Sequence, residues 1–314
     1  MAMIEHTYLG DYPGEVQADW TDECQGVTHD RDHWFITQKN AVWRVPIGKD
    51  LQTPLRHGVD GVRRGLIPVE GYDHFGDPDF HGETLYAPLE GSRRFLFWTR
   101  YEVPRIAALT GNDLRLRWSA LLSQQQAPWC AVNAERTLYS SNSRVTPRVE
   151  RRAGPLFRYR LEEAGLTLID RVILRDEQGT PLVLDSVQGG AFADDRHLYI
   201  SCGYYKDPKP SWGIHLFDMR TQRRIARSTN GHGPFNYEFH AEDPYDEEPE
   251  GLTWWDLDPM ASPGISGQLH AILLDNDSNG DDVYFKHYRV EGLPRSLDPR
   301  QVAAEPQVVA REPV

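Results

Sequence analysis

A few polar residues stand at equivalent places in five similar segments of the 314-residue chain. They are Gln25, the group His74, Asp77 and Asp79, and then Asn133, Gln188 and Glu250. Calcium takes about six to eight oxygen ligands from carboxylates, amides and water. If the segments meet at one axis, we expect Glu250, Asn133 and Asp77 to bind calcium there. Without a cation, burying Glu250 near Asp77 would be costly, because like charges in a dry site cannot both ionise.

The segment around His74 could also perform acid–base chemistry. We expect His74 to act as a general base, with Asp77 and Asp79 as the catalytic carboxylates beside it. With His81 added, the pattern His-x2-Asp-x-Asp-x-His could suit a transition metal. In a strand, however, residues 77, 79 and 81 share one face and residue 74 lies on the other. All four would therefore meet only at a bulge, which favours the acid–base role.

Five side chains are candidates for substrate binding. Gln25 and Gln188 would hydrogen-bond a polar substrate, whereas Trp129, Phe192 and Trp254 would enclose an apolar one. Two structural alternatives stay open. The amides could hydrogen-bond only neighbouring strands and trapped water. The aromatic rings could pack between neighbouring sheets.

A second candidate cation site is Asp275-Asn276-Asp277-Ser278-Asn279-Gly280-Asp281, which matches the first seven positions of a calcium-binding loop. Position 12 of that loop would be Lys286 rather than glutamate, and no helices are expected to flank it. Asn-Gly between two apolar strands is also the strongest short hairpin signal. We therefore predict a hairpin turn, with weak calcium binding as the alternative.

The five segments that carry these residues share one plan. Each has a strand of small residues, a polar loop, and a second strand that opens with an apolar pair. The pairs recur about 50 to 70 residues apart. They are Trp34-Phe35, Leu85-Tyr86, Leu138-Tyr139, Leu198-Tyr199 and Leu269-His270. The small-residue strands are 25–28, 76–79, 129–133, 188–192 and 250–254.

Third and fourth strands complete each segment. We expect third strands at 41–47, 95–103, 156–161, 213–219 and 282–290, and fourth strands at 65–69, 114–121, 166–174 and 224–228. The fifth segment lacks a fourth strand, and His6-Thr7-Tyr8-Leu9 has no place in the first. We predict an all-β, five-bladed β-propeller over 1–314 as one domain, its ring closed by the N-terminal strand.

Two other folds are alternatives, a six-bladed ring and a pair of β-sandwiches. Only a propeller needs small residues in the first strand of every segment, because its innermost strands converge on a narrow axis. Gly26, Gly76, Ala131, Gly189 and Gly251 satisfy that need.

Composition limits the partners. The formal charge is -13, so the surface repels phosphate backbones and nucleic acid is not an expected partner. Cys24, Cys130 and Cys202 are too few and too scattered for a disulfide framework or a zinc knuckle. The N-terminus lacks the pattern of a signal peptide, and no apolar run is long enough to span a membrane. We expect a cytoplasmic protein with no membrane partner and a small-molecule substrate or ligand.

Several catalytic motifs are missing. The chain has no Gly-x-Ser-x-Gly, no phosphate-binding Gly-x-x-x-x-Gly-Lys, no His-Glu-x-x-His and no Cys-x-x-Cys. In contrast, 25–28, 188–192 and 250–253 resemble the calcium-dependent propellers of the gluconolactonase and paraoxonase type. That resemblance implies one calcium ion at the axis, held by acidic and amide side chains such as Glu250 and Asn133, which polarises a lactone or phosphoester.

The first functional hypothesis is a metal-assisted hydrolase or lyase acting on a small ester, lactone or sugar-like substrate in the central channel, with calcium as Lewis acid. The second is a non-catalytic propeller that binds a carbohydrate or a protein through aromatic residues, namely Tyr204, Tyr205, Trp212, Trp254 and Trp255. The third is a metal-free enzyme that encloses an apolar substrate.

Overall fold

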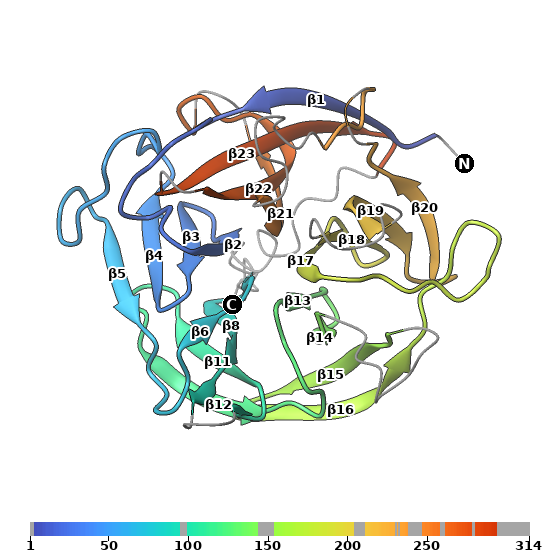
Figure 1. The fold of residues 1–314 in the computed structure, drawn as a ribbon, viewed down its shortest axis with the longest axis horizontal. Helices are drawn as coiled ribbons and strands as arrows, with labels where there is room; N and C mark the ends of the chain where they lie inside the picture. The colour runs from blue at the N-terminus through green and yellow to red at the C-terminus, as the bar shows by residue number, and fades with distance from the viewer. Residues whose placement is uncertain are drawn as a thin grey trace, which may run out of the picture.

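The computed structural model describes residues 3–94, 99–143, 154–203, 211–229, 231, 233–237, 247–257, 261–277 and 280–293. Five β-sheets stand side by side around a common axis, each with its first strand innermost (Figure 1). The predicted five-bladed β-propeller is therefore confirmed. No helix within these residues has the length and hydropathy that crossing a bilayer requires.

The blades follow one another along the chain. Blade 1 consists of β2 (Cys24–His29), β3 (His33–Gln38), β4 (Ala41–Pro46) and β5 (Arg63–Leu66). Blade 2 consists of β6 (His74–Phe75), β7 (Asp79–His81), β8 (Thr84–Glu90), β11 (Arg105–Thr110) and β12 (Leu116–Leu121). Blade 3 consists of β13 (Ala131–Val132), β14 (Thr137–Ser140), β15 (Leu156–Glu162) and β16 (Gly165–Val172). Blade 4 consists of β17 (Val187–Phe192), β18 (His197–Cys202), β19 (Gly213–Asp218) and β20 (Arg223–Arg227). Blade 5 consists of β21 (Glu247–Leu257), β22 (Gly267–Asp277), β23 (Gly280–Glu291) and β1 (Glu5–Asp11).

The ring closes as the sequence predicts. Strand β1 pairs antiparallel with β23, from Glu5 opposite Glu291 to Asp11 opposite Lys286. Figure 1 shows β1 as the outermost strand of the last blade, although it begins the chain. The two ends of the ring are thus hydrogen-bonded within one sheet, which covers the edge that β23 would otherwise expose.

The apolar pairs predicted to open the second strands all lie in second strands, namely β3, β8, β14, β18 and β22. The predicted third strand of blade 2, at 95–103, is wrong. Residues 92–94 and 99–101 form a separate two-stranded hairpin of β9 (Ser92–Arg94) and β10 (Thr99–Tyr101), and β11 takes the third place. Residues 95–98 lie outside the described part of the chain. The pairing of Asp277 of β22 with Gly280 of β23 confirms the predicted hairpin after Asp275, although residues 278 and 279 of its turn lie outside the described part of the chain.

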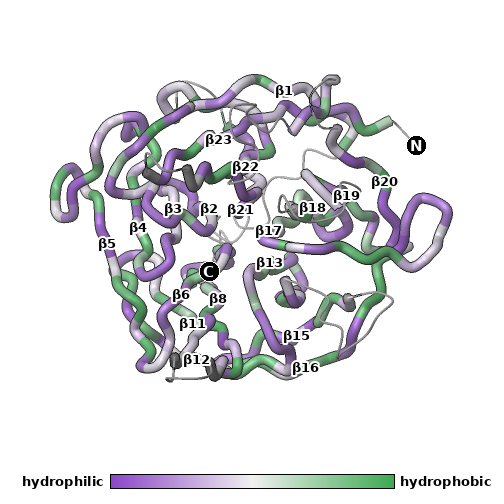
Figure 2. Tube along the Cα trace, viewed as in Figure 1, coloured by the Kyte–Doolittle hydropathy of each residue, from purple (hydrophilic) through white to green (hydrophobic). Residues whose placement is uncertain are grey.

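Each seam between neighbouring blades holds its own hydrophobic core. Successive side chains of a strand point to opposite faces. In β3, Trp34 and Ile36 therefore pack toward blade 5, whereas Phe35 packs toward blade 2. Central strands are buried on both faces, which explains their nearly continuous apolar sequences. Figure 2 shows hydrophobic and hydrophilic residues interspersed around the whole ring rather than gathered on one side of it.

Candidate functional site

Asp77 fills the axis, at the break between β6 and β7. Its Oδ1 accepts a hydrogen bond from the Val27 N–H at 3.0 Å, and its Oδ2 accepts from the N–H groups of Gly190 at 3.0 Å and Leu252 at 3.4 Å. Its own N–H donates to the Pro128 carbonyl at 2.7 Å. One residue of blade 2 is thereby bonded to the other four blades. Burial raises the pKa of Asp77, and the three N–H donors oppose that rise.

The glycines beside Asp77 explain the small residues of the innermost strands. A Cβ at Gly26 would lie 2.4 Å from the Asp77 Cα, and a Cβ at Gly251 would lie 2.0 Å from its Oδ1. Real Cβ atoms do not approach other atoms so closely. The innermost strands therefore meet with backbone against backbone, and the Asp77 carboxyl group occupies the space that the sequence suggested would be a channel.

Asp79 and Asn133 lie further along the innermost strands. The Asp79 Oδ2 accepts from the Val132 N–H at 2.7 Å, and its Oδ1 accepts from the Phe80 N–H at 2.8 Å. The Asn133 Oδ1 accepts from the Thr137 N–H at 2.9 Å and so shapes the turn between β13 and β14. The carboxyl group of Asp79 and the amide oxygen of Asn133 therefore both accept hydrogen bonds from backbone N–H groups.

The predicted calcium ligands do not fit the ion as a set. Both Asp77 oxygens face backbone N–H groups, and the Asn133 oxygen is bonded within its own turn. Within the described ranges, no three His, Cys, Asp or Glu side chains are grouped in a way that could hold a metal ion.

His74 and Gln25 meet where the innermost strands begin. The His74 Nε2 lies 2.6 Å from the Gln25 Oε1, and the Gln25 Nε2 donates to the Cys24 carbonyl at 3.3 Å. That carbonyl fixes the amide, so Oε1 must face the imidazole. His74 therefore donates through Nε2–H and keeps a lone pair on Nδ1, to which no described residue donates. Burial, followed by the Lys39 charge, lowers the pKa of His74.

Glu250 lies on the same side of Asp77, on β21. It is buried, and its Oε1 lies 3.5 Å from the Gln188 Nε2. Burial raises its pKa well above the ordinary range, and the charge of the Glu248 carboxyl group and the hydrogen bond that Glu250 donates to that group raise it further. A carboxyl–carboxyl hydrogen bond requires a proton, and the raised pKa favours its place on Glu250. We call Gln25, His74, Gln188, Glu248 and Glu250 the central polar cluster.

The three predicted aromatic residues lie apart from this cluster. Trp129 and Phe192 are buried in the core between blades 3 and 4. Trp254 is half-buried and stacks on Tyr199, with ring centroids 5.7 Å apart. Trp212 packs against the core between blades 4 and 5, while Tyr204 and Tyr205 fall outside the described residues.

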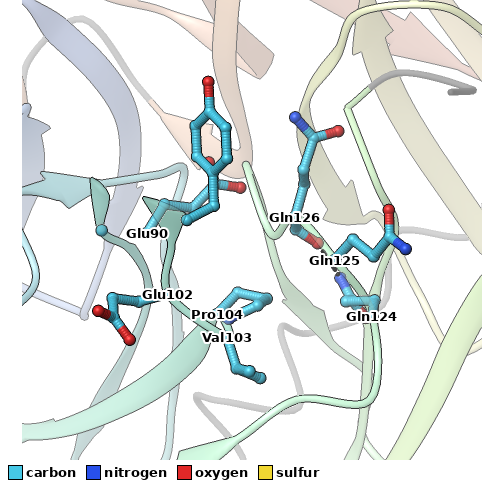
Figure 3. A pocket seen from close by; sticks show the side chains of 9 residues that line it. Glu90, Glu102, Val103, Pro104, Gln124, Gln125 and Gln126 are labelled. Atoms are coloured by element: carbon cyan, nitrogen blue, oxygen red, sulfur yellow. Dashed lines mark hydrogen bonds between the residues drawn. The ribbon is translucent and has the colours of Figure 1, made fainter. Parts of the chain in front are cut away.

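A pocket beside the cluster was not predicted from the sequence. It has a volume of about 510 Å³ and lies between blades 2 and 3. Figure 3 shows Glu90 on one side and Gln125 and Gln126 on the other, with Val103 and Pro104 between them. Glu90 lies opposite His74 in the β6–β8 register. The signal that could have revealed this pocket is the insertion between β8 and β11, because Gly91 and residues 101–104 supply much of the described wall.

Comparisons with known proteins locate the chain by fold. No protein-family model matches it, and no curated protein matches its sequence. The glutaminyl cyclase of Myxococcus xanthus has a TM-score of 0.55 over 91% of this chain and 97% of its own, at 11% identity. A GH43_1 enzyme from Xanthomonas citri has a TM-score of 0.46 over 84% of this chain and 86% of its own, at 12% identity. The first likeness shows a shared β-propeller fold, and the second is too distant to carry an argument. Neither gives sequence support to the gluconolactonase or paraoxonase type.

Proposed function

We propose that this protein is an enzyme, a hydrolase or lyase that acts on a small ester, lactone or sugar-like substrate at the central polar cluster. One observation carries the proposal. His74 has a lowered pKa and Glu250 a raised pKa on the same side of the axis. The lowered pKa favours a neutral base and the raised pKa favours a protonated acid, and pairs of groups with such opposed shifts are typical of acid–base catalysis.

Ester or lactone hydrolysis would proceed as follows. The His74 Nδ1 accepts a proton from a water molecule as the water oxygen bonds to the substrate carbonyl carbon. The carbon–oxygen bond to the leaving group then breaks, and that oxygen takes the proton that Glu250 has held. Transfer of the His74 proton to solvent and uptake of one by Glu250 restore both groups. Gln188, beside Glu250, would hydrogen-bond a polar substrate oxygen.

The charge around the cluster favours an uncharged substrate. Glu23, Glu248 and Glu250 all contribute negative potential here when ionised. Lys39 is the near cation, and its Nζ is paired with the Glu23 Oε1 at 2.8 Å. Anionic substrates would therefore be repelled. A glutaminyl cyclase of the same fold supports an enzyme in general and says nothing of this substrate.

Turnover of p-nitrophenyl acetate, γ-butyrolactone and p-nitrophenyl glycosides tests the proposal. We expect at least one of these probes to be turned over. His74→Gln and Glu250→Gln should each lower kcat/KM by about 100-fold or more, as loss of a general acid or base does. The exposed Gln52→Ala is the matched control and should leave the rate unchanged. Activity should also persist in EDTA. Wild-type rates retained by both cluster variants would refute the assignment.

A further inference from the structure

The pocket lined by Glu90, Val103, Pro104, Gln125 and Gln126 has the construction of a ligand site. We propose that this Glu90 pocket binds an uncharged, hydroxyl-rich ligand such as one or two sugar units. Its volume of about 510 Å³ falls within the ~300–1,000 Å³ range of small-molecule sites. The proposal rests on the proposed function only in taking the bound ligand to be the substrate.

The loop that presents the two glutamine amides is held rigidly from behind. The buried Gln124 Nε2 donates to the carbonyls of Gln126 at 2.8 Å and Ser141 at 3.1 Å. The Asn142 Oδ1 accepts from the backbone N–H groups of Gln125 at 3.0 Å and Gln126 at 2.9 Å. The Tyr159 hydroxyl donates to the Gln124 Oε1 at 3.1 Å. Such support reduces the entropy lost when a ligand binds, which raises affinity.

Glu90 provides the opposite wall and is held in the same manner. Its Oε1 accepts from the Ala127 N–H at 2.5 Å, and no described residue donates to its Oε2. Burial raises the pKa of Glu90, because the hydrogen bond from Ala127 only partly offsets the loss of water. A raised pKa favours the protonated carboxyl group, which can donate to one hydroxyl and accept from another.

The lining chemistry selects the ligand class. The described residues that line the pocket include no lysine, arginine or histidine, so none of them would attract an anion. Glu102 points away from Gln125 and Gln126 (Figure 3), which leaves Glu90 as the acid facing them. Amides both donate and accept, as hydroxyl groups do. Val103 and Pro104 supply an apolar surface for the C–H face of a sugar ring, and the 75% exposed Tyr101 stands at the rim.

An array of immobilised neutral, amino and uronic oligosaccharides, probed with the full-length protein, tests the inference. We expect binding to neutral members and at least 10-fold weaker binding to uronic ones. The best neutral probe is then titrated in solution against variants. Glu90→Leu and the double variant Gln125→Leu/Gln126→Leu should each weaken binding by 10-fold or more. Glu90→Gln, which keeps both a donor and an acceptor, should stay within about 3-fold of wild type, as should the exposed control Gln52→Leu.

Three results would overturn the inference. The first is tighter binding of amino sugars than of neutral ones. The second is wild-type binding by both Leu variants with an unchanged melting temperature. The third is no binding by any member of the array. The outcomes also separate this inference from the proposed function. Binding at the pocket without turnover would refute only the enzyme, whereas turnover unaffected by the Leu variants would refute only the pocket.

Discussion

Asp77 and Glu250 are both buried acids near the axis, yet their surroundings differ. Asp77 has three backbone N–H donors aimed at its oxygens. Glu250 has one long contact with an amide and a second carboxyl group beside it. The first arrangement stabilises a structural carboxyl group. The second leaves an acid poorly compensated, as is common where a side chain is retained for chemistry at a cost in stability.

Replacing Glu250 by Gln should therefore stabilise the protein at neutral pH. The pKa of Glu250 is raised in the folded state, so its stabilising contribution is complete below its ordinary pKa of 4.5 and is lost as the pH rises toward the folded-state pKa. The glutamine side chain carries no ionisable group, so the variant does not lose stability in this way. The difference in free energy of unfolding between variant and wild type should grow by about 1.4 kcal/mol per pH unit from the ordinary pKa up to the folded-state pKa. Urea unfolding at pH 5, 6, 7 and 8 measures it.

Asp77→Asn is the matched contrast for that experiment. One carboxyl oxygen becomes an NH2 group facing a buried N–H donor, so we expect a loss of about 1–3 kcal/mol. A Glu250→Gln variant that is less stable than wild type at pH 8 would contradict this account of the two acids.

The contact between Gln25 and His74 makes a second residue-scale prediction. Gln25→Glu should place a carboxylate against Nε2–H and raise the pKa of His74 by about one unit or more, because a nearby opposite charge favours the imidazolium. An NMR titration of the His74 ring measures that pKa without any substrate. The control is Gln188→Glu, whose side chain meets Glu250 rather than His74. An unchanged titration in Gln25→Glu would show that Gln25 does not set the state of His74.

At the scale of elements, the innermost strands depend on glycine wherever backbone meets backbone. Gly251→Ala places a Cβ 2.0 Å from the Asp77 Oδ1 and 2.4 Å from the Gly26 Cα. Backbone cannot move aside as a flexible side chain can, so we expect a loss of about 3 kcal/mol or more in the free energy of unfolding. Gly48→Ala is the control, since its Cβ would meet nothing within 4 Å. Equal urea midpoints for the two variants would contradict the packing argument.

The arrangement of strands within a blade could be predicted because its sequence signals are local. Apolar pairs, small-residue strands and turn residues are each encoded within a few positions, which is why five blades and the role of β1 could be predicted. The third strand of blade 2 could not be predicted correctly. Its composition makes Thr99–Tyr101 a good candidate for a strand, and this segment does form one, but in a hairpin outside the blade. Arg105–Thr110, with two alanines, has the weaker strand signal and occupies the blade.

The candidate site depends on contacts between blades, and such contacts are harder to predict from the sequence. Gln25, His74, Gln188 and Glu250 were placed at one level by their positions in the repeat, and the structure joins them in two pairs, Gln25 with His74 and Gln188 with Glu250. The same repeat gave no sign that Asp77 would turn its carboxyl group toward the N–H groups of three other blades. Glu90 and the Gln124–Gln126 loop join across a seam between blades, which no local pattern encodes.

At the scale of the whole molecule, ring closure depends on one strand that is remote in sequence from its sheet. In β1, His6 stacks on Phe235, with ring centroids 3.8 Å apart, and its Nε2 lies 2.9 Å from the Tyr199 hydroxyl. The Tyr8 N–H donates to the Pro234 carbonyl at 2.8 Å. Strand β1 therefore does more than complete the sheet of blade 5. It also binds that blade to blade 4 and to the segment that follows it.

A chain that starts at residue 12 should lose this closure and expose the edge of β23, which is a template for pairing with other chains. We expect it to aggregate in size-exclusion chromatography with light scattering and to unfold at a lower urea concentration. A synthetic peptide of residues 3–11 supplied in trans should restore the elution and scattering of the chain of residues 1–314, since an added strand can complete an open sheet edge. A peptide with the same residues in scrambled order should not, because the register places His6 and Tyr8 against defined partners. If residues 12–314 alone match the chain of residues 1–314 in urea midpoint and in molar mass by light scattering, the ring does not need β1 to cover the edge of β23.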